Sequence, residues 1–302
     1  MLNKIIFIGL VLICTIFAQT TDLESEVKKK SDEIPQGINY GGLVTANFSQ
    51  TALQNWASGG NNSVAVNGLL NLFLNYRKGK GIWRNTADFG YGLLRQGEDG
   101  NVIKTDDRIE INSKYGLNAT NNWYYSGMLN FVTQMAKGYK YEGDSVKISA
   151  PFAPAYLTTA LGMDYQKGDV FDIFLSPVTG KLTLVIDDDL SSQGAFGVEK
   201  NSNSRLEFGG YIKTGYRKEL IENVTLTTNL SFFSNYLDNP QNIDIDWKTL
   251  VAMQVNKYIS ANISVHMIYD DDIVTFDETG KKEGPDVQLK EIIGIGLSYS
   301  FK

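Results

Sequence analysis

Two neighbouring side chains on one extended segment are of types that could do chemistry. The single histidine, His266, follows Ser264 by two residues, so both side chains share one face of a strand. A serine beside a histidine is the beginning of a nucleophile–base pair, as in a serine hydrolase. The alternate residues Ile263, Val265 and Met267 are apolar, so the pair would face away from lipid. We interpret it as polar lining, predict no catalytic residue, and expect that the protein is not an enzyme.

Two runs of three aspartates could bind a cation. They consist of Asp187, Asp188 and Asp189, and of Asp270, Asp271 and Asp272. Carboxylate oxygens are the ligands that Ca²⁺ and Mg²⁺ prefer, although neither run has the spacing of an EF-hand loop. Acidic rims also keep a surface soluble. A Ca²⁺ or Mg²⁺ site therefore remains open, and we predict no other cofactor.

Charged residues of both signs recur at alternate positions, where they would share the inner face of a closed sheet. They are Arg84, Asp88, Arg108, Glu110, Lys114, Arg205, Glu207, Lys213, Arg217, Asp244, Asp246, Lys248, His266 (if protonated) and Lys290. A water-filled pore and a plugged interior braced by ion pairs would both use such residues. The sequence leaves both interpretations open.

The segments that position these residues alternate between two kinds of side chain. Apolar residues occupy the even positions of 64–76 and nearly all odd positions of 287–301. Strict alternation indicates strands. Strands of globular proteins commonly have about five or six residues, and both segments are about twice that length or more. A tilted strand that crosses a bilayer needs about ten.

Twelve such segments follow one another along the chain. They run near 40–50, 64–78, 82–96, 107–120, 122–137, 155–167, 169–186, 204–218, 222–237, 242–256, 258–270 and 287–301. Connections between them are alternately tight and mostly long, as in a barrel with short periplasmic turns and longer outer loops. We predict an all-β fold, a single antiparallel transmembrane β-barrel of about twelve strands.

One strand breaks the alternation. Outward apolar residues lie at odd positions up to Leu175 and at even positions from Leu182. Pro177 lies between them and cannot donate a ladder hydrogen bond. One extra residue would restore the register, so we predict a β-bulge near Pro177.

Composition and the first residues bear on location. Mean hydropathy is −0.20 with 42% hydrophobic residues, which excludes a helical membrane protein, and the net charge of −6 argues against nucleic acid. Lys4 followed by a short apolar run predicts a signal peptide over residues 1–18. A flexible periplasmic leader over 19–39 and a barrel over 40–302 would follow. We expect an outer-membrane location after cleavage; Cys14, the single cysteine, would be removed.

Three short motifs stand out in the sequence: Asn-Trp-x-x-Gly-Gly at 55–60, Ser-Pro-x-x-Gly-Lys at 176–181 and Gly-Ala-Phe-Gly at 194–197. On these motifs the chain resembles an uncharacterised family of outer-membrane β-barrels from Bacteroidota. The resemblance implies a barrel in the outer membrane and no particular activity.

Three functions follow, in decreasing order of preference. The first is a barrel that passes or binds a small polar solute through its mixed-charge lumen. The second is a plugged barrel that anchors or recruits partners through its outer loops, and a lipid hydrolase is a distant third. Expected partners are outer-membrane lipid and the barrel-assembly machinery, which would contact the C-terminal strand. The oligomeric state stays open.

Overall fold

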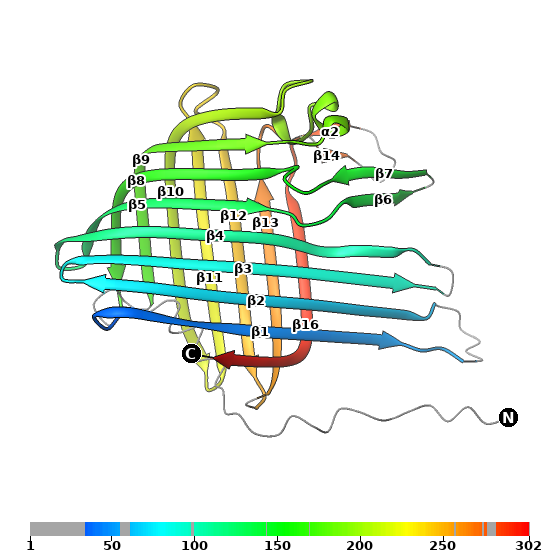
Figure 1. Ribbon diagram of the computed structural model, residues 1–302, viewed down its shortest axis with the longest axis horizontal. Helices are drawn as coiled ribbons and strands as arrows, with labels where there is room; N and C mark the ends of the chain where they lie inside the picture. Colours follow the sequence, from blue (N-terminus) through cyan, green and yellow to red (C-terminus); the bar gives the residue numbers. More distant parts are fainter. Residues whose placement is uncertain are drawn as a thin grey trace.

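Twelve antiparallel strands form one closed barrel in the computed structural model. It describes residues 34–54, 61–97, 100–142, 144–168, 170–256, 258–273, 275–276 and 282–301. The predicted signal peptide, most of the predicted leader and the Asn-Trp-x-x-Gly-Gly segment lie outside these residues. The order around the ring is β1-β16-β13-β12-β11-β10-β9-β8-β5-β4-β3-β2. In Figure 1 the strands of one wall cross those of the opposite wall.

The barrel strands have the following bounds. They are β1 (Gly37–Thr51), β2 (Ser63–Lys78), β3 (Gly81–Gln96), β4 (Val102–Thr120), β5 (Trp123–Thr133), β8 (Ala155–Lys167), β9 (Phe171–Leu184), β10 (Ser204–Ile221), β11 (Val224–Asn235), β12 (Ile243–Gln254), β13 (Ile259–Tyr269) and β16 (Gln288–Phe301). Each matches a predicted segment in order, so the predicted twelve-stranded barrel is confirmed.

Large apolar side chains cover the outside of this barrel. Leu206 is 72% exposed and Ile293 70% exposed, and many others are at least one-third exposed. Examples from around the ring are Val44, Val66, Leu74, Ile111, Leu129, Leu161, Ile212, Trp247, Leu289 and Leu297. A closed sheet satisfies its backbone groups internally and can therefore turn such a wall toward lipid. This is the surface of a transmembrane barrel.

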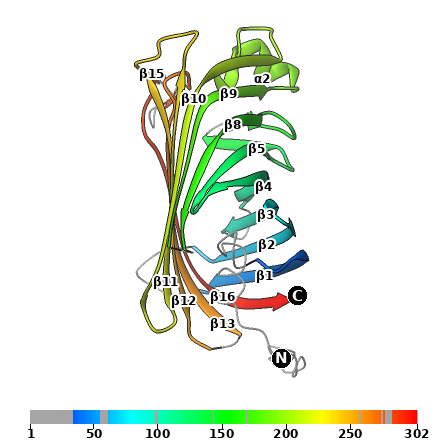
Figure 2. The same cartoon turned by 90° about the vertical axis from the view of Figure 1, so that its left-hand side faces the viewer.

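The two ends of the barrel differ. At one end, which we name the turn end, tight connections follow β2, β4, β8, β10 and β12. Gly79 and Asn121 there have φ of 58° and 41°, a left-handed conformation that glycine and asparagine tolerate best. The other end, the loop end, carries mostly long connections. Figure 2 shows β16 finishing at the end away from α2.

Two boundaries lie earlier than alternation predicts. β1 begins at Gly37, three residues before the predicted start of the barrel, and Gln36 Oε1 accepts a hydrogen bond of 3.0 Å from Gly79 N. β4 begins at Val102, earlier than predicted. Gly92 pairs with Asp106 and Leu93 with Lys104, so Thr105 is an extra residue that forms a bulge. That bulge breaks the alternation, so the first residues of β4 do not follow the pattern of the rest.

The predicted bulge in β9 is present. Thr179 pairs with Gly209 of β10 and Ser176 pairs with Tyr211, so two residues of β9, Pro177 and Val178, lie opposite the single Gly210 of β10. The same offset occurs against β8. The buried Ser176 hydroxyl donates a hydrogen bond of 2.8 Å to the carbonyl oxygen of Leu161. Because of the bulge, Lys181 points into the lumen.

Small elements occupy the loop end. They are β6 (Gly138–Glu142), β7 (Asp144–Ser149), α2 (Asp188–Gln193), η1 (Ala195–Gly197), β14 (Thr275–Phe276) and β15 (Lys282–Gly284). Buried Ala150, Ala153, Val185, Leu190 and Val198 form a core between the connection after β5 and the one after β9. No helix among the described residues has the length and apolar character to cross a membrane.

The seam between β1 and β16 is short. Pairing there joins Gly42–Asn47 to Gly296–Phe301. From Phe48 to Thr51, β1 pairs in the described structure with β2 alone. From Gln288 to Ile295, β16 pairs there with β13 alone. The ring is therefore closed through the turn-end half of this seam.

Candidate functional site

Charged side chains from seven strands (β3, β4, β8, β9, β10, β12 and β13) meet inside the barrel and form three clusters along its length. We name them by position and define each below. They contain most of the predicted lumen residues together with Asp164, Lys181, Asp270 and Asp272.

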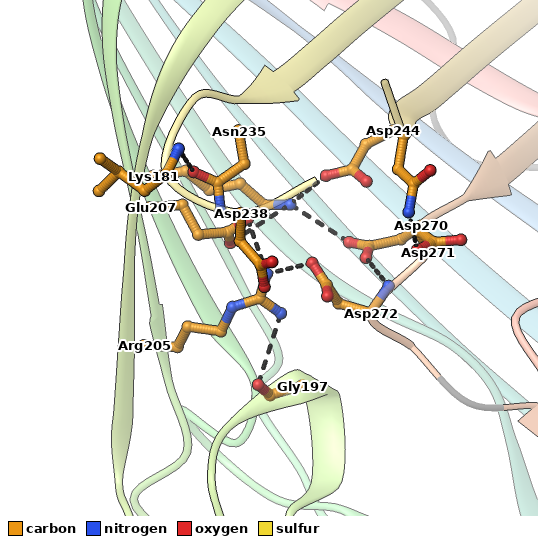
Figure 3. Close-up of polar contacts among 12 residues, drawn as sticks. Lys181, Gly197, Arg205, Glu207, Asn235, Asp238, Asp244, Asp270, Asp271 and Asp272 are labelled. Carbon is orange, nitrogen blue, oxygen red and sulfur yellow. Dashed lines mark hydrogen bonds and ion pairs between the residues drawn. The ribbon is translucent and has the colours of Figure 1, made fainter. Parts of the chain in front are cut away.

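The loop-end cluster consists of Lys181, Arg205, Glu207, Asp244, Asp270 and Asp272 (Figure 3). Lys181 Nζ lies 2.7 Å from Asp244 Oδ2, 3.2 Å from Asp270 Oδ2 and 3.7 Å from Glu207 Oε2. Arg205 Nη2 lies 3.0 Å from Glu207 Oε1 and also pairs with Asp272. Two cations thus bridge four carboxylates from β10, β12 and the segment after β13.

This cluster is tied to the loop above it. Arg205 Nη1 donates a hydrogen bond of 3.4 Å to the carbonyl oxygen of Gly197 in η1. Lys181 Nζ lies 5.2 Å from the centre of the Phe233 ring, a cation–π contact. The loop that carries α2 and η1 is therefore held by the same side chains that line the mouth (Figure 3).

The two aspartate runs contact basic side chains and hydrogen-bond donors. Asp187 and Asp189 lie 2.8 and 2.5 Å from Lys147 Nζ, Asp188 lies between them in α2, and Asp187 caps α2 by accepting from Leu190 N. Asp271 accepts from Asn242 and from the Tyr269 hydroxyl. Within the described residues no three His, Cys, Asp or Glu side chains are grouped as a metal site. Cation binding at this rim stays a prediction.

The pair on β7 and α2 shifts the acidity of both partners. Hydrogen bonds from Lys147 to Asp187 and Asp189 raise the pKa of Lys147 to about 12. The same contact with Lys147 lowers the pKa of the Asp187 carboxyl below its ordinary value. Both groups lie outside the membrane-spanning strands, and each stabilises the charged form of the other.

The central cluster joins opposite walls. It consists of Arg108, Glu110, Asp246, Lys248 and His266. Lys248 Nζ of β12 lies 3.4 Å from Glu110 Oε2 of β4, although β12 is six steps from β4 in either direction around the ring. Each partner also has a neighbour on its own strand, since Glu110 pairs with Arg108 and Lys248 lies 3.6 Å from Asp246. The lumen is thus bridged from wall to wall.

His266 belongs to this cluster and not to a serine pair. Its Nε2 lies 3.3 Å from Asp246 Oδ1. Ser264 pairs by register with Leu250 and Ile292, and no hydrogen bond joins it to His266 in the described structure. Both side chains alternate with lipid-facing Val265, so they face the lumen. This orientation does not favour hydrolysis of membrane lipid.

The turn-end cluster surrounds Asp164 and adds Arg84, Lys114 and Gln166. The Asp164 carboxylate is fully buried and lies 3.0 Å from Arg84 Nη2 and 2.8 Å from Lys114 Nζ. Gln166 Nε2 donates to it at 2.5 Å. Lys114 Nζ also lies 5.5 Å from the centre of the Phe174 ring. One acid therefore binds two cations from two other strands.

Below this cluster the turn end is filled by packed side chains. Phe73, Ile82 and Tyr124 are each no more than 3% exposed. Ile34, which precedes β1, is also buried, and its carbonyl oxygen accepts a hydrogen bond of 3.0 Å from Arg77 Nη1. These side chains fill part of the lumen at the turn end.

The remaining predicted lumen residues fall into two groups. Asp88 accepts from Asn71 Nδ2 at 2.5 Å, and Lys290 of β16 pairs with Asp106 of β4. Lys213 and Arg217 also lie on the inner face of β10, yet neither makes an ion pair with any described carboxylate. Asp164 and Lys181 were not predicted as site residues, although both face inward. Asp164 alternates with outward Tyr165 on β8, and the bulge at Pro177 turns Lys181 inward on β9.

Comparison with known proteins gives the following similarities. The family model described as "Protein of unknown function (DUF3078)" matches residues 48–139. No curated protein sequence matches the chain. Among solved structures, an outer membrane channel from Pseudomonas putida F1 is 12% identical, over 89% of this chain and 96% of that chain, with a TM-score of 0.40.

Two further structures are similar at the same low level. The translocator domain of the autotransporter NalP from Neisseria meningitidis is 10% identical, over 93% of this chain and 95% of that one, with a TM-score of 0.38. The outer membrane phospholipase of Salmonella typhi, solved as a dimer with bound calcium, is 12% identical over 90% and 95%, with a TM-score of 0.35. Each is a distant similarity of overall form.

Proposed function

We propose that the protein is an outer-membrane barrel that is closed at rest and passes small polar solutes when its cross-lumen ion pairs separate. The observation that carries this proposal is the contact between Glu110 and Lys248, which joins opposite walls at 3.4 Å. A side-chain bridge across the centre obstructs free diffusion. Side chains can move apart without changing the barrel wall, so the same bridge can open.

The outer wall supports the membrane location. Exposed aromatic rings lie near the turn end at Tyr76, Trp83, Tyr125, Tyr299 and Phe301, and near the loop end at Phe208, Tyr236 and Trp247. Amphipathic rings favour the level of the lipid headgroups on both sides of a bilayer. The predicted signal peptide and the outward apolar wall both support a location in the outer membrane.

A polar solute fits this lumen for an electrostatic reason. Separating Glu110 from Lys248 in a confined space leaves two charges with weaker compensation, which is costly. A solute with charged or hydrogen-bonding groups supplies new partners to both as it passes. An apolar solute supplies none, so the lumen excludes it.

Single-channel conductance of the refolded protein tests the proposal. Lys248→Met removes the bridge while Glu110 keeps Arg108, and Glu110→Leu removes it while Lys248 keeps Asp246. We expect either variant to conduct more than the wild-type protein. Lys147→Met, which removes a cation outside the lumen, is the control and should leave conductance unchanged. Folded variants that remain as closed as the wild type would contradict the proposal.

A plugged barrel that anchors partners is the second candidate. The packed turn end favours it, because Phe73, Ile82, Tyr124 and Ile34 are almost fully buried. In that case the central bridge would serve only stability. Loss of stability without any gain of conductance in Lys248→Met would select this candidate.

A further inference from the structure

Two basic side chains in the lumen lack the carboxylate partners that the others have. Arg84, Arg108, Lys114, Arg205, Lys248 and Lys290 each pair with an aspartate or glutamate. Lys213 and Arg217 have no such partner among the described residues. Arg217 is only 9% exposed, and its Nη1 makes no hydrogen bond.

A buried guanidinium without a counter-charge is energetically unfavourable. Lys213 and Arg217 are four positions apart on β10. An even spacing places both on one face of the strand, and the rise of a strand puts them about 13 Å apart. Two carboxylates share this face: Asp172, which pairs by register with Gly215 between the two cations, and Glu219, two residues beyond Arg217. Neither forms an ion pair with Lys213 or Arg217 in the described structure.

The central cluster carries no surplus of either sign. Arg108, Lys213 and Lys248 are balanced by Glu110, Asp246 and Asp88, and Asp88 pairs by register with Glu110. On β10, Lys213 and Arg217 remain the inward cations that make no ion pair with a described carboxylate.

We propose that the inner face of β10 is an anion-binding surface, on which the Arg217 guanidinium binds a small oxyanion such as a phosphate, sulfate or carboxylate. Guanidinium binds such groups through two parallel hydrogen bonds, whereas ammonium acts as a point charge. Arg217 is thus the binding residue and Lys213 the second positive charge along the path. This inference rests on the proposed function and adds the solute class, small anions.

Calorimetric titration of inorganic phosphate into the refolded protein in detergent and low-chloride buffer tests the site. We expect the wild-type protein to bind phosphate, and Arg217→Met to weaken binding about tenfold or more. Lys218→Met is the matched control, because Lys218 is the next residue, exposed and on the other face. It should bind as the wild type does. Asp172→Asn should bind more tightly, because it removes the neighbouring negative charge.

Thermal stability separates a binding role from a structural one. Because the Arg217 side chain makes no ion pair with a described residue, Arg217→Met should melt no lower than the wild type without phosphate. Phosphate should raise the Tm of the wild type and of Lys218→Met, but not that of Arg217→Met. A lower Tm of Arg217→Met without phosphate, equal binding by Arg217→Met and wild type, or no binding by folded wild type would each overturn the inference. The last result combined with conductance by Lys248→Met would overturn the anion site and leave the proposed function standing.

Discussion

At the scale of single residues, Asp164 shows how the interior is balanced. Its carboxylate is fully buried and holds Arg84 and Lys114 from two other strands. Replacement of a buried acid that neutralises two cations leaves both without compensation, and this costs far more than the pair contributed. Asp164 is therefore important for the stability of the turn end. In the central bridge, by contrast, Glu110 and Lys248 each have a second ion-pair partner.

We expect Asp164→Ala to lower the free energy of unfolding by about 3–5 kcal/mol, because it leaves two inward charges unpaired. Urea unfolding in detergent micelles, followed by heat-modifiable gel mobility, measures this change. Asp189→Ala is the control, because its side chain is 77% exposed, and exposed ion pairs contribute about 0–1 kcal/mol. Equal stability of the two variants would contradict the burial argument.

At the scale of elements, the loop-end hairpin β6–β7 is held to α2 by Lys147. The pKa of Asp187 is lowered in the folded protein by this contact. The contact between Lys147 and Asp187 therefore contributes its full stabilisation above the ordinary aspartate pKa of about 3.9. The effect is lost as the pH falls through the lower folded-state value, because the protonated carboxyl no longer pairs.

We expect the distance between spin labels at Val146 of β7 and Ser192 of α2 to be narrowly distributed at pH 7 and broad in strong acid, below the lowered folded-state pKa of Asp187. Both positions are exposed. The mature chain has no cysteine if Cys14 is removed, so labelling is specific. Lys147→Met should show the broad distribution at both pH values. A distribution that stays narrow in acid would show that other contacts hold the hairpin.

Alternation was enough to predict the strands, their order and the bulge at Pro177, because a strand allows only two faces. It also placed Arg84, Glu110 and Lys248 inward. It did not predict that Glu110 meets Lys248, since contacts across a barrel depend on tilt and stagger of all twelve strands. The bulge at Thr105 was not predicted, because the residues from Lys104 to Arg108 include no Pro or Gly and are polar on both faces. The core around Leu190 joins two irregular loops. Their sequences have no periodic pattern, so this core was not predicted.

At the scale of the whole molecule, the asymmetry of the ends and the apolar wall predict where the protein is found. Mature protein should occur in the outer-membrane fraction, begin at or near Gln19 and migrate faster in gels before heating than after. N-terminal sequencing and gel mobility measure these properties. The soluble fraction is the control. Uncleaved protein in the inner membrane would contradict the location.

The β1–β16 seam joins the two ends of the chain, so closing it requires the largest loss of chain entropy in the molecule. Only Gly42–Asn47 and Gly296–Phe301 reward that closure with pairing. Beyond these residues, Phe48–Thr51 pairs in the described structure with β2 alone and Ile292–Ile295 with β13 alone. One edge of each segment is therefore without a ladder, and a foreign strand can add to such an edge. Because this seam has so little pairing, we expect it to form last during folding and to open first during unfolding.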